Sequence, residues 1–305
     1  MRNVSLRQIR VFAAVAQQKS FTRAARELHL TQPAVSQQLK LLEAEVGLPL
    51  LEHVGRGIHL TDAGEELLRY SHQINEIMRS ASESFAAMRG LKRGILKLGA
   101  VSTAKYFAPS LLSAFTVEFP QVTIKFTVGN REEIIRQLAG NEIDLVIMGR
   151  PPRELVTTAE PFAKHPLVII ASPDHPLAAS KKRIPLKQLS SQNFVIREQG
   201  SGTRASMEHV FRERGTAYRA SMEVSSNETI KQAVMAGMGI SFISRHTVSL
   251  ELAAGKLVTL NVSGLPLLRD WYVIHLRDKR LSPITVAFRS FLLKRGAEII
   301  EKTVG

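Results

Sequence analysis

The chain has 305 residues, of which 44% are hydrophobic and 22% charged, a balance that is ordinary for a folded protein. This length predicts about two or three domains, each able to bury its own core. No apolar run approaches the roughly 20 residues of a membrane helix, and the first six residues lack the apolar stretch of a secretory signal. Because the sequence has no cysteine, disulfides, thiolate zinc sites and cysteine redox sensing are excluded. We therefore expect a cytoplasmic protein that has no membrane partner.

The charge of the chain is strongly basic and unevenly distributed. The formal net charge at pH 7 is +14. Residues 1–94 hold 13 Lys and Arg against 9 Asp and Glu, whereas residues 95–305 hold 28 against 18. Such an excess points to polyanions or small anions as ligands, and its distribution makes an anionic ligand for the larger part plausible. A merely solvated basic surface is the alternative.

Two short helices are predicted at the start of the chain. Apolar residues recur at helical spacing from Leu6 to Ala16. Ser20 then stands at an N-cap position, and a second, shorter apolar stripe runs from Phe21 to Leu28. The first segment is therefore predicted to be all helical.

A third helix is predicted after Thr31, its N-cap, with Pro33 in the first turn, where a missing N–H costs nothing. Its apolar side carries Val35, Leu39, Leu42 and Val46. Its opposite, polar side carries Pro33, Ser36, Gln37 and Lys40. Gly47 and Pro49 then end the helix.

A small hairpin and a long helix follow. The hairpin is predicted at residues 50–60, with Arg56 between two glycines at its tip. The helix is predicted from Thr61 to about Arg89, and at 1.5 Å per residue it is about 40 Å long. Its apolar residues follow a 3–4 spacing. Since this helix outreaches a roughly 60-residue domain, we favour dimerisation through it, with packing against its own domain as the alternative.

From Ile95 onward, strands and helices alternate. Strands are predicted at 95–101, 122–129, 143–149, 166–172, 193–199, 240–244 and 271–276. Helices are predicted at 106–119, 130–140, 203–215, 227–239 and 282–301. Such alternation indicates a parallel α/β sheet. We expect two lobes, with the chain crossing over near 160–165 and returning near 265.

The polar side of the third helix carries the residue types that read DNA. Gln, Ser and Lys or Arg side chains pair with base edges and phosphates in a major groove. The preceding helix, the short turn and the basic hairpin favour a helix-turn-helix over a solvated helix face. Arg56 is placed to reach a phosphate or the minor groove, and Arg23 lies in the crossing helix. The predicted DNA contacts are Arg23, Thr31, Gln32, Pro33, Ser36, Gln37, Lys40 and Arg56.

These motifs resemble the winged helix-turn-helix of LysR-type transcriptional regulators. Gln32-Pro33-Ala34-Val35-Ser36 and Leu60-Thr61-Asp62-Ala63-Gly64 occur in register with the family pattern over residues 6–64. Leu51 and His53 stand where the family usually has Phe and Arg, so the packing or phosphate contact of those positions is weakened or made pH-sensitive here. The rest of the chain fits as well.

The resemblance implies an architecture that is α/β overall. It comprises an all-α winged helix-turn-helix domain at 1–61, a linker and dimerisation helix at 62–89, a hinge at 90–94 and an effector-binding domain at 95–305. The effector-binding domain resembles periplasmic solute-binding proteins, with lobe I at 95–162 and 266–305 and lobe II at 163–265. The resemblance further implies a homodimer that assembles to a homotetramer, binds promoter or operator DNA and contacts RNA polymerase.

Polar groups at strand-to-helix junctions are candidates for effector binding. Ser102 and Thr103 follow the first strand at the mouth of the next helix, where free N–H groups and the helix dipole favour an anion. Residues 200–204, Gly-Ser-Gly-Thr-Arg, repeat the arrangement in the second lobe and add a guanidinium. Helix capping explains some of these residues equally well, and the two roles are compatible. The predicted effector residues are Ser102, Thr103, Asn130, Arg150, Ser201, Gly202, Thr203, Arg204 and Asn227.

Signatures of catalysis are absent from the sequence. It contains no G-x-S-x-G and no P-loop, and the pair Gly237 and Gly239 lacks the third glycine of a dinucleotide fingerprint. The nine histidines form no H-x-x-x-H or H-x-x-E pair, so we expect no metal, no cofactor and no enzyme activity.

The sequence therefore predicts a DNA-binding transcriptional regulator that responds to a small anionic metabolite. Residues 129–152 look most like regulators of the RuBisCO (carbon-fixation) operon, for which the ligand would be a phosphorylated intermediate or a reduced nucleotide. One alternative is a LysR-type regulator of another pathway. The other is a small-molecule binding protein or enzyme built on the α/β lobes, without specific DNA binding.

Overall fold

The structure, a computed structural model, describes residues 4–54, 57–88, 93–180 and 182–305. The chain divides into two compact units, Met1–Ser82 and Glu83–Gly305, which we call the N-terminal and C-terminal units. None of the helices within the described ranges is long and apolar enough to cross a membrane.

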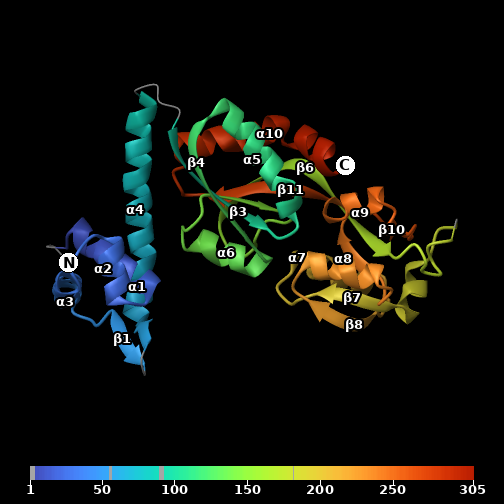
Figure 1. Ribbon diagram of the computed structural model, residues 1–305, viewed down its shortest axis with the longest axis horizontal. Helices are drawn as coiled ribbons and strands as arrows, with labels where there is room; N and C mark the ends of the chain where they lie inside the picture. The colour runs from blue at the N-terminus through green and yellow to red at the C-terminus, as the bar shows by residue number, and fades with distance from the viewer. Residues whose placement is uncertain (1–3, 55–56, 89–92, 181) are drawn as a thin grey trace. The chain divides into compact units, whose positions relative to one another are not determined.

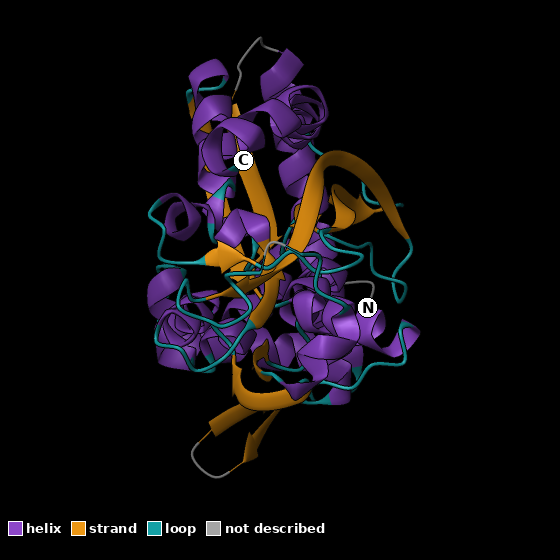
Figure 2. Cartoon of the chain, turned by 90° about the vertical axis from the view of Figure 1, so that its right-hand side faces the viewer, coloured by secondary structure: helices purple, strands orange, loops and turns teal. Residues whose placement is uncertain are grey.

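The N-terminal unit contains the predicted helices and hairpin (Figure 1). Its elements are α1 (Leu6–Gln18), α2 (Phe21–Glu27), α3 (Gln32–Val46), β1 (Leu51–Val54), β2 (Gly57–Leu60) and the start of α4 (Asp62–Met88). The strands β1 and β2 pair antiparallel and form the hairpin at the lower end of Figure 2.

Side-chain caps fix where the short helices begin. The hydroxyl groups of Ser20 and Thr31 accept hydrogen bonds from the backbone N–H groups of Arg23 and Ala34, as the sequence predicted. Gly47 ends α3 with φ at 78°, a left-handed conformation that favours glycine. These caps set the ends of α3.

Gly64 lies where α4 passes the backbone that leads into the hairpin. A Cβ atom at this position would lie 2.0 Å from the carbonyl oxygen of Leu50, so only glycine fits. The Thr61 hydroxyl donates to the carbonyl of Pro49 (2.7 Å) and accepts from the backbone N–H of Gly64 (3.1 Å). The motif at 60–64 therefore fastens the start of α4 to the hairpin.

The C-terminal unit is built on one large sheet with the strand order β10-β6-β11-β5-β3-β4, and β9 also pairs with β6. Its strands are β3 (Arg93–Val101), β4 (Gln121–Gly129), β5 (Leu145–Met148), β6 (Thr157–Ala171), β7 (Asn193–Arg197), β8 (Arg219–Val224), β9 (Ser241–Ser244), β10 (Val258–Thr259) and β11 (Leu267–Leu276). Its α-helices are α5 (Ala108–Glu118), α6 (Arg131–Ala139), α7 (Gly202–Glu213), α8 (Asn227–Met235), α9 (Ser249–Ala253) and α10 (Pro283–Val304). Its 3₁₀ helices are η1 (Ala104–Tyr106), η2 (Leu186–Ser191) and η3 (Arg245–Thr247).

The sheet is mixed, so the prediction of a parallel sheet was wrong for its centre. β3 is parallel to β4 and β5, and β7 and β8 form a separate two-stranded parallel sheet. β6 and β11, however, pair antiparallel along their lengths, from Leu267 opposite Leu167 to Leu276 opposite Thr157. These two strands carry the chain from one lobe to the other and back, and therefore run in opposite directions.

The boundaries of two predicted segments differ from the structure. Strand β6 begins at Thr157, well before the predicted start at Pro166, because pairing with β11 extends it through a stretch that contains Pro161. Arg93 and Gly94, placed in the predicted hinge, are paired with β4. The predicted hinge residues 90–92 lie outside the described residues.

Each lobe has its own hydrophobic core around its part of the strands. In lobe I, α5 and α10 cover one face of the sheet and α6 covers the other (Figure 1). In lobe II, α7 packs on one cluster with β6 and β7, and α8 packs on another. The two lobes are thus separate cores joined by the strand pair β6 and β11.

Candidate DNA-binding surface and effector cavity

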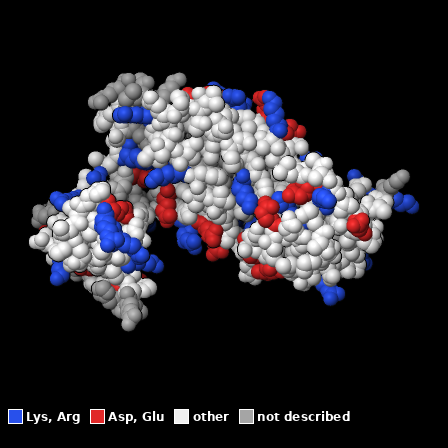
Figure 3. All heavy atoms as spheres, in the orientation of Figure 1, with Lys and Arg blue, Asp and Glu red and all other residues white. Residues whose placement is uncertain are grey.

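The polar side of α3 faces solvent. Thr31, Gln32, Pro33, Gln37 and Lys40 are exposed, and Ser36 is half-buried. On the opposite side Val35, Leu39 and Leu42 are buried in the core of the N-terminal unit. Figure 3 shows Lys and Arg side chains gathered on the visible face of this unit. Packing of the apolar side against the core therefore leaves the predicted DNA-reading side of α3 exposed to solvent.

Arg23 is exposed, as a phosphate contact requires, and its guanidinium donates to the carbonyl of Gln18 at the end of α1. Leu51, which replaces the usual Phe, is half-buried and packs against both hydrophobic clusters of the unit. The smaller side chain thus retains a packing role. Arg56 and the side chain of His53 lie outside the described residues, so their contacts with DNA stay predictions.

A cavity of about 270 Å³ lies between the two lobes of the C-terminal unit. Of the nine predicted effector residues, seven line it: Ser102, Thr103, Asn130, Arg150, Ser201, Gly202 and Thr203. They come from both lobes, since the first four belong to lobe I and the last three to lobe II. The structure therefore brings together groups that are far apart in sequence.

Helix caps account for two of these residues. The Asn130 side chain accepts from the backbone N–H of Glu133 (2.9 Å) at the start of α6, and Ser201 accepts from that of Arg204 (3.5 Å) at the start of α7. Thr103 is buried and makes no capping hydrogen bond, although it precedes η1. The first residues of α6 and α7 thus line the cavity, where the positive end of each helix dipole favours an anion.

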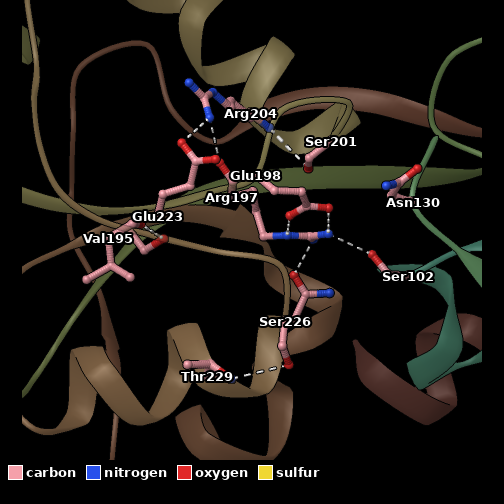
Figure 4. A network of polar contacts seen from close by, with 12 residues as sticks. Ser102, Asn130, Val195, Arg197, Glu198, Ser201, Arg204, Glu223, Ser226 and Thr229 are labelled. Atoms are coloured by element: carbon pink, nitrogen blue, oxygen red, sulfur yellow. Dashed lines mark hydrogen bonds and ion pairs between the residues drawn. The ribbon is translucent and has the colours of Figure 1, made fainter. Parts of the chain in front are cut away.

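Arg197 was missed by the sequence analysis, although it lines the cavity and is 3% exposed. Its guanidinium donates to both carboxylate oxygens of Glu198, to Oδ1 of Asn227 (2.7 Å) and, across the lobes, to Oγ of Ser102 (3.1 Å) (Figure 4). One feature of the sequence could have identified Arg197. It is an arginine at the end of a largely apolar strand, just before the glycine-rich loop 200–204. Arg197 joins lobe II to lobe I at the cavity wall.

Two predicted effector residues do not line the cavity. Asn227 is buried behind Arg197 and positions its guanidinium, and Ser226 rather than Asn227 caps α8. Arg204 donates to the carboxylates of Glu208 (2.8 Å) and Glu223 (2.7 Å). Hydrogen bonds to these carboxylates raise the pKa of Arg204. The charge of Arg204 is therefore satisfied within lobe II, away from the cavity.

The cavity carries excess positive charge. Its lining includes Arg131, Arg150, Arg153, Arg197 and Arg269, but only one carboxylate, that of Glu154. Arg131 is held by the carbonyls of residues 150 and 151, and burial lowers its pKa. The guanidinium groups of Arg150, Arg153 and Arg269 form no ion pair with any carboxylate in the described ranges. An anionic ligand would offset this charge.

Two family models match the chain. The model "LysR substrate binding domain" matches residues 89–297, and "Bacterial regulatory helix-turn-helix protein, lysR family" matches residues 6–65. The RuBisCO operon transcriptional regulator of Allochromatium vinosum is 48% identical over 297 residues, which cover 97% of this chain and 98% of that protein. The regulator CfxR of Cupriavidus necator is 46% identical over 305 residues, which cover 100% of this chain and 96% of that protein.

Solved structures agree with this result. The CcmR regulatory domain of Synechocystis PCC6803, in complex with 2-PG, is 42% identical with a TM-score of 0.63, over 66% of this chain and 96% of that chain. Full-length CbnR complexed with its target DNA shares the fold, with a TM-score of 0.68 at 24% identity, over 96% of this chain and all of the other. The chain belongs to the LysR family and is a LysR-type DNA-binding transcriptional regulator.

Proposed function

We propose that this regulator controls carbon-fixation genes in response to a small phosphorylated anion that binds between the lobes of the C-terminal unit. The ligand class is inferred from the cavity itself, where arginines outnumber carboxylates and onto which two helix N-termini open. The pathway is supported by similarity to RuBisCO operon regulators and to a CcmR regulatory domain solved with 2-PG.

The DNA contacts we propose are the exposed side chains of α3 together with Arg23 and Arg56. Gln37 and Lys40 project from the middle of the helix, where side chains reach base edges and phosphates. Contacts to phosphates position the protein, whereas contacts to base edges select the operator.

We propose dimerisation through α4. Apolar side chains at Tyr70, Ile77, Met78 and Phe85 are between 46% and 67% exposed in the single chain. Exposed apolar residues repeated along one long helix are typical of a helix that pairs with another helix. A homodimer that assembles to a homotetramer would present two or more recognition helices to DNA and contact RNA polymerase. Such a regulator acts in the cytoplasm and needs neither a catalytic reaction nor a cofactor.

Coupling between ligand and DNA requires that the ligand favour one arrangement of the lobes. The hydrogen bond from Arg197 to Ser102 spans the two lobes at the cavity wall. An anion bound beside it would compete for, or reinforce, the same guanidinium. The ligand would thereby alter the closure of the lobes, and through the oligomer the geometry of the two recognition helices.

The experiment that tests the proposal is binding of the purified protein to DNA upstream of carbon-fixation genes, titrated with salt and with 2-PG. We expect selective, salt-dependent binding that shifts with 2-PG. Thr103→Val, which removes a hydroxyl from the cavity wall, should weaken the response to 2-PG and leave DNA binding unchanged. Binding no tighter than to random DNA would refute the proposed targets, and an unchanged response in Thr103→Val would move the ligand elsewhere.

A further inference from the structure

His165 is a buried histidine in the cavity wall whose polar atoms have no partner. It lies on the crossing strand β6 and is 6% exposed. Neither ring nitrogen has a hydrogen-bond partner in the described part of the chain. Buried polar atoms in native proteins are normally paired with protein, water or ligand, so an unpaired pair of ring nitrogens beside a cavity requires an explanation.

The surroundings of His165 hold its ring in one orientation. The ring stacks on Trp271, with centroids 3.8 Å apart and planes 19° apart. On its edge, a Cβ atom at Gly149 would lie 2.6 Å from Nδ1, so a larger residue there would displace the ring. The indole N–H of Trp271 donates to Nδ1 of His246 (3.1 Å). Trp271 therefore has no donor left for His165. The imidazole is thus fixed by packing alone.

Arg269 stands next to His165 across the strand pair. The two residues are directly opposite in the antiparallel register of β6 and β11, and side chains opposite each other lie on the same face of a sheet. Both line the cavity, and the guanidinium of Arg269 has no carboxylate partner in the described ranges. Burial, with the charges of His246 and Arg269, lowers the pKa of His165 to about 3, so its ring is neutral and offers one N–H donor.

We propose that His165 and Arg269 form a second binding point in the cavity, where two donors meet a hydrogen-bond acceptor of the ligand. This second binding point selects effectors that carry an anionic oxygen group in addition to the phosphate. This inference rests on the proposed function, in which a phosphorylated anion binds between the lobes, near Arg197 and the two helix N-termini. The N–H of His165 and the guanidinium of Arg269 are both donors, so the group that they meet is an acceptor, such as a carboxylate or a second phosphate. Inorganic phosphate and simple phosphate monoesters lack this group.

The test compares two ligands that differ only in the second group. Phosphoglycolate carries a phosphate and a carboxylate on two carbons, and ethyl phosphate has the same length without the carboxylate. Binding of each to the full-length protein is measured by calorimetry. Emission of Trp271, the single tryptophan of the sequence, is recorded in parallel because its ring stacks on His165. We expect phosphoglycolate to bind at least about tenfold more tightly and to change the emission more strongly, since only its carboxylate reaches the histidine.

Two variants test whether His165 and Arg269 cause the preference for phosphoglycolate. His165→Phe keeps a planar ring on Trp271 and removes both nitrogens, and Arg269→Met removes the guanidinium while keeping most of the length. Each should bring the two affinities within about threefold of one another by weakening phosphoglycolate alone. Arg277→Met is the matched control, because Arg277 is exposed and does not line the cavity. It should preserve the preference of the wild type.

The outcomes separate this inference from the function on which it rests. If the wild type binds both ligands equally, or if both variants weaken both ligands by the same factor, the second binding point is wrong and the phosphate site stands. If the wild type binds neither phosphoglycolate nor ethyl phosphate, the proposed function falls, and this inference falls with it. Loss of folding in His165→Phe would leave Arg269→Met to decide.

Discussion

The two units of this regulator present positive charge to anions in opposite ways. On α3, the cationic side chain of Lys40 is exposed to solvent. In the cavity of the C-terminal unit, Arg197 is 3% exposed and is already bound to Glu198, Ser102 and Asn227. The first arrangement suits a large polyanion that arrives from outside, whereas the second suits a small anion that must be enclosed.

This difference has a measurable physical consequence. Charges in water are screened by salt over about 10 Å at 0.1 M, whereas buried pairs are screened much less. DNA binding by the N-terminal unit should therefore fall steeply with salt. Binding of an effector between the lobes should fall less, because Arg197 and Asn227 are buried. Variants that alter one unit at a time test this difference.

The largest effect is expected from Gly64→Val. The new Cβ would lie 2.0 Å from the carbonyl oxygen of Leu50, and backbone cannot yield as a flexible side chain does. We expect the N-terminal unit to lose about 3 kcal/mol or more of stability and DNA binding to be lost. Circular dichroism should show an early loss of helix during heating, while the emission of Trp271, which lies in the C-terminal unit, stays at its native value until a later transition.

The matched control for this variant is Gly47→Asn. No atom lies within 4 Å of a Cβ at Gly47, and asparagine tolerates the positive φ of 78° better than other side chains. A single, common transition in Gly64→Val, with DNA binding retained, would contradict the close approach of α4 to the hairpin.

Acid should destabilise the C-terminal unit through its buried histidines. Burial lowers the pKa of His165 to about 3 and that of His246 to about 4, with the charge of Arg245 adding to the effect on His246. In the unfolded chain the histidine pKa is about 6.5. Between these values the unfolded chain binds protons that the folded unit excludes, so stability is full above about pH 6.5 and is lost as the pH falls.

The free energy of unfolding should fall by about 1.4 kcal/mol per pH unit for each histidine once the pH lies well below 6.5. Denaturant unfolding followed by Trp271 emission, between pH 7 and pH 5, measures it before most carboxylates titrate. His165→Phe should remove about half of the slope. A free energy of unfolding that is constant over this range would mean that the two rings are charged or solvated in the folded protein.

The exposed polar side of α3 was predictable because its determinants are local. Thr31 caps the helix, Pro33 fits its first turn, and the apolar spacing of Val35 and Leu39 fixes which side is buried. All of these act within one helix. Ser102 and Ser201 were also predictable, because Ser102 directly follows a strand that the periodicity had identified and Ser201 caps the helix after another such strand.

The rest of the cavity depends on strand pairing between distant parts of the chain. His165 and Arg269 become neighbours only through the register of β6 against β11, which no local pattern specifies. Arg204 matched the helix-mouth pattern, but its orientation is decided by Glu208 and Glu223, of which Glu223 lies on the unpredicted strand β8. The spacing of residues along the sequence therefore predicts where the backbone lies, whereas tertiary contacts decide which side chains reach the ligand.

A smaller effect is expected from Lys40→Ala. Removing the exposed cation that we propose as a phosphate contact should lower the salt slope of DNA binding by about 1 and leave effector affinity unchanged. Lys187→Ala is the matched control, since Lys187 is exposed in the C-terminal unit and the same charge is removed there. Salt slopes that fall equally in the two variants would show that α3 contributes only to net charge.

The smallest effect is expected from Ser102→Ala, which tests the enclosed arrangement of the cavity. The alanine removes the acceptor that Arg197 uses across the lobes, but the guanidinium keeps its bonds to Glu198 and Asn227 and so remains buried and paired. We expect effector affinity to change by about 1 kcal/mol, or roughly fivefold, with folding and operator affinity unchanged. Ser102→Thr keeps a hydroxyl and should restore most of the affinity. If both variants bind the effector like the wild type, the contact from Arg197 to Ser102 does not couple the lobes, and closure must be carried by other contacts between them.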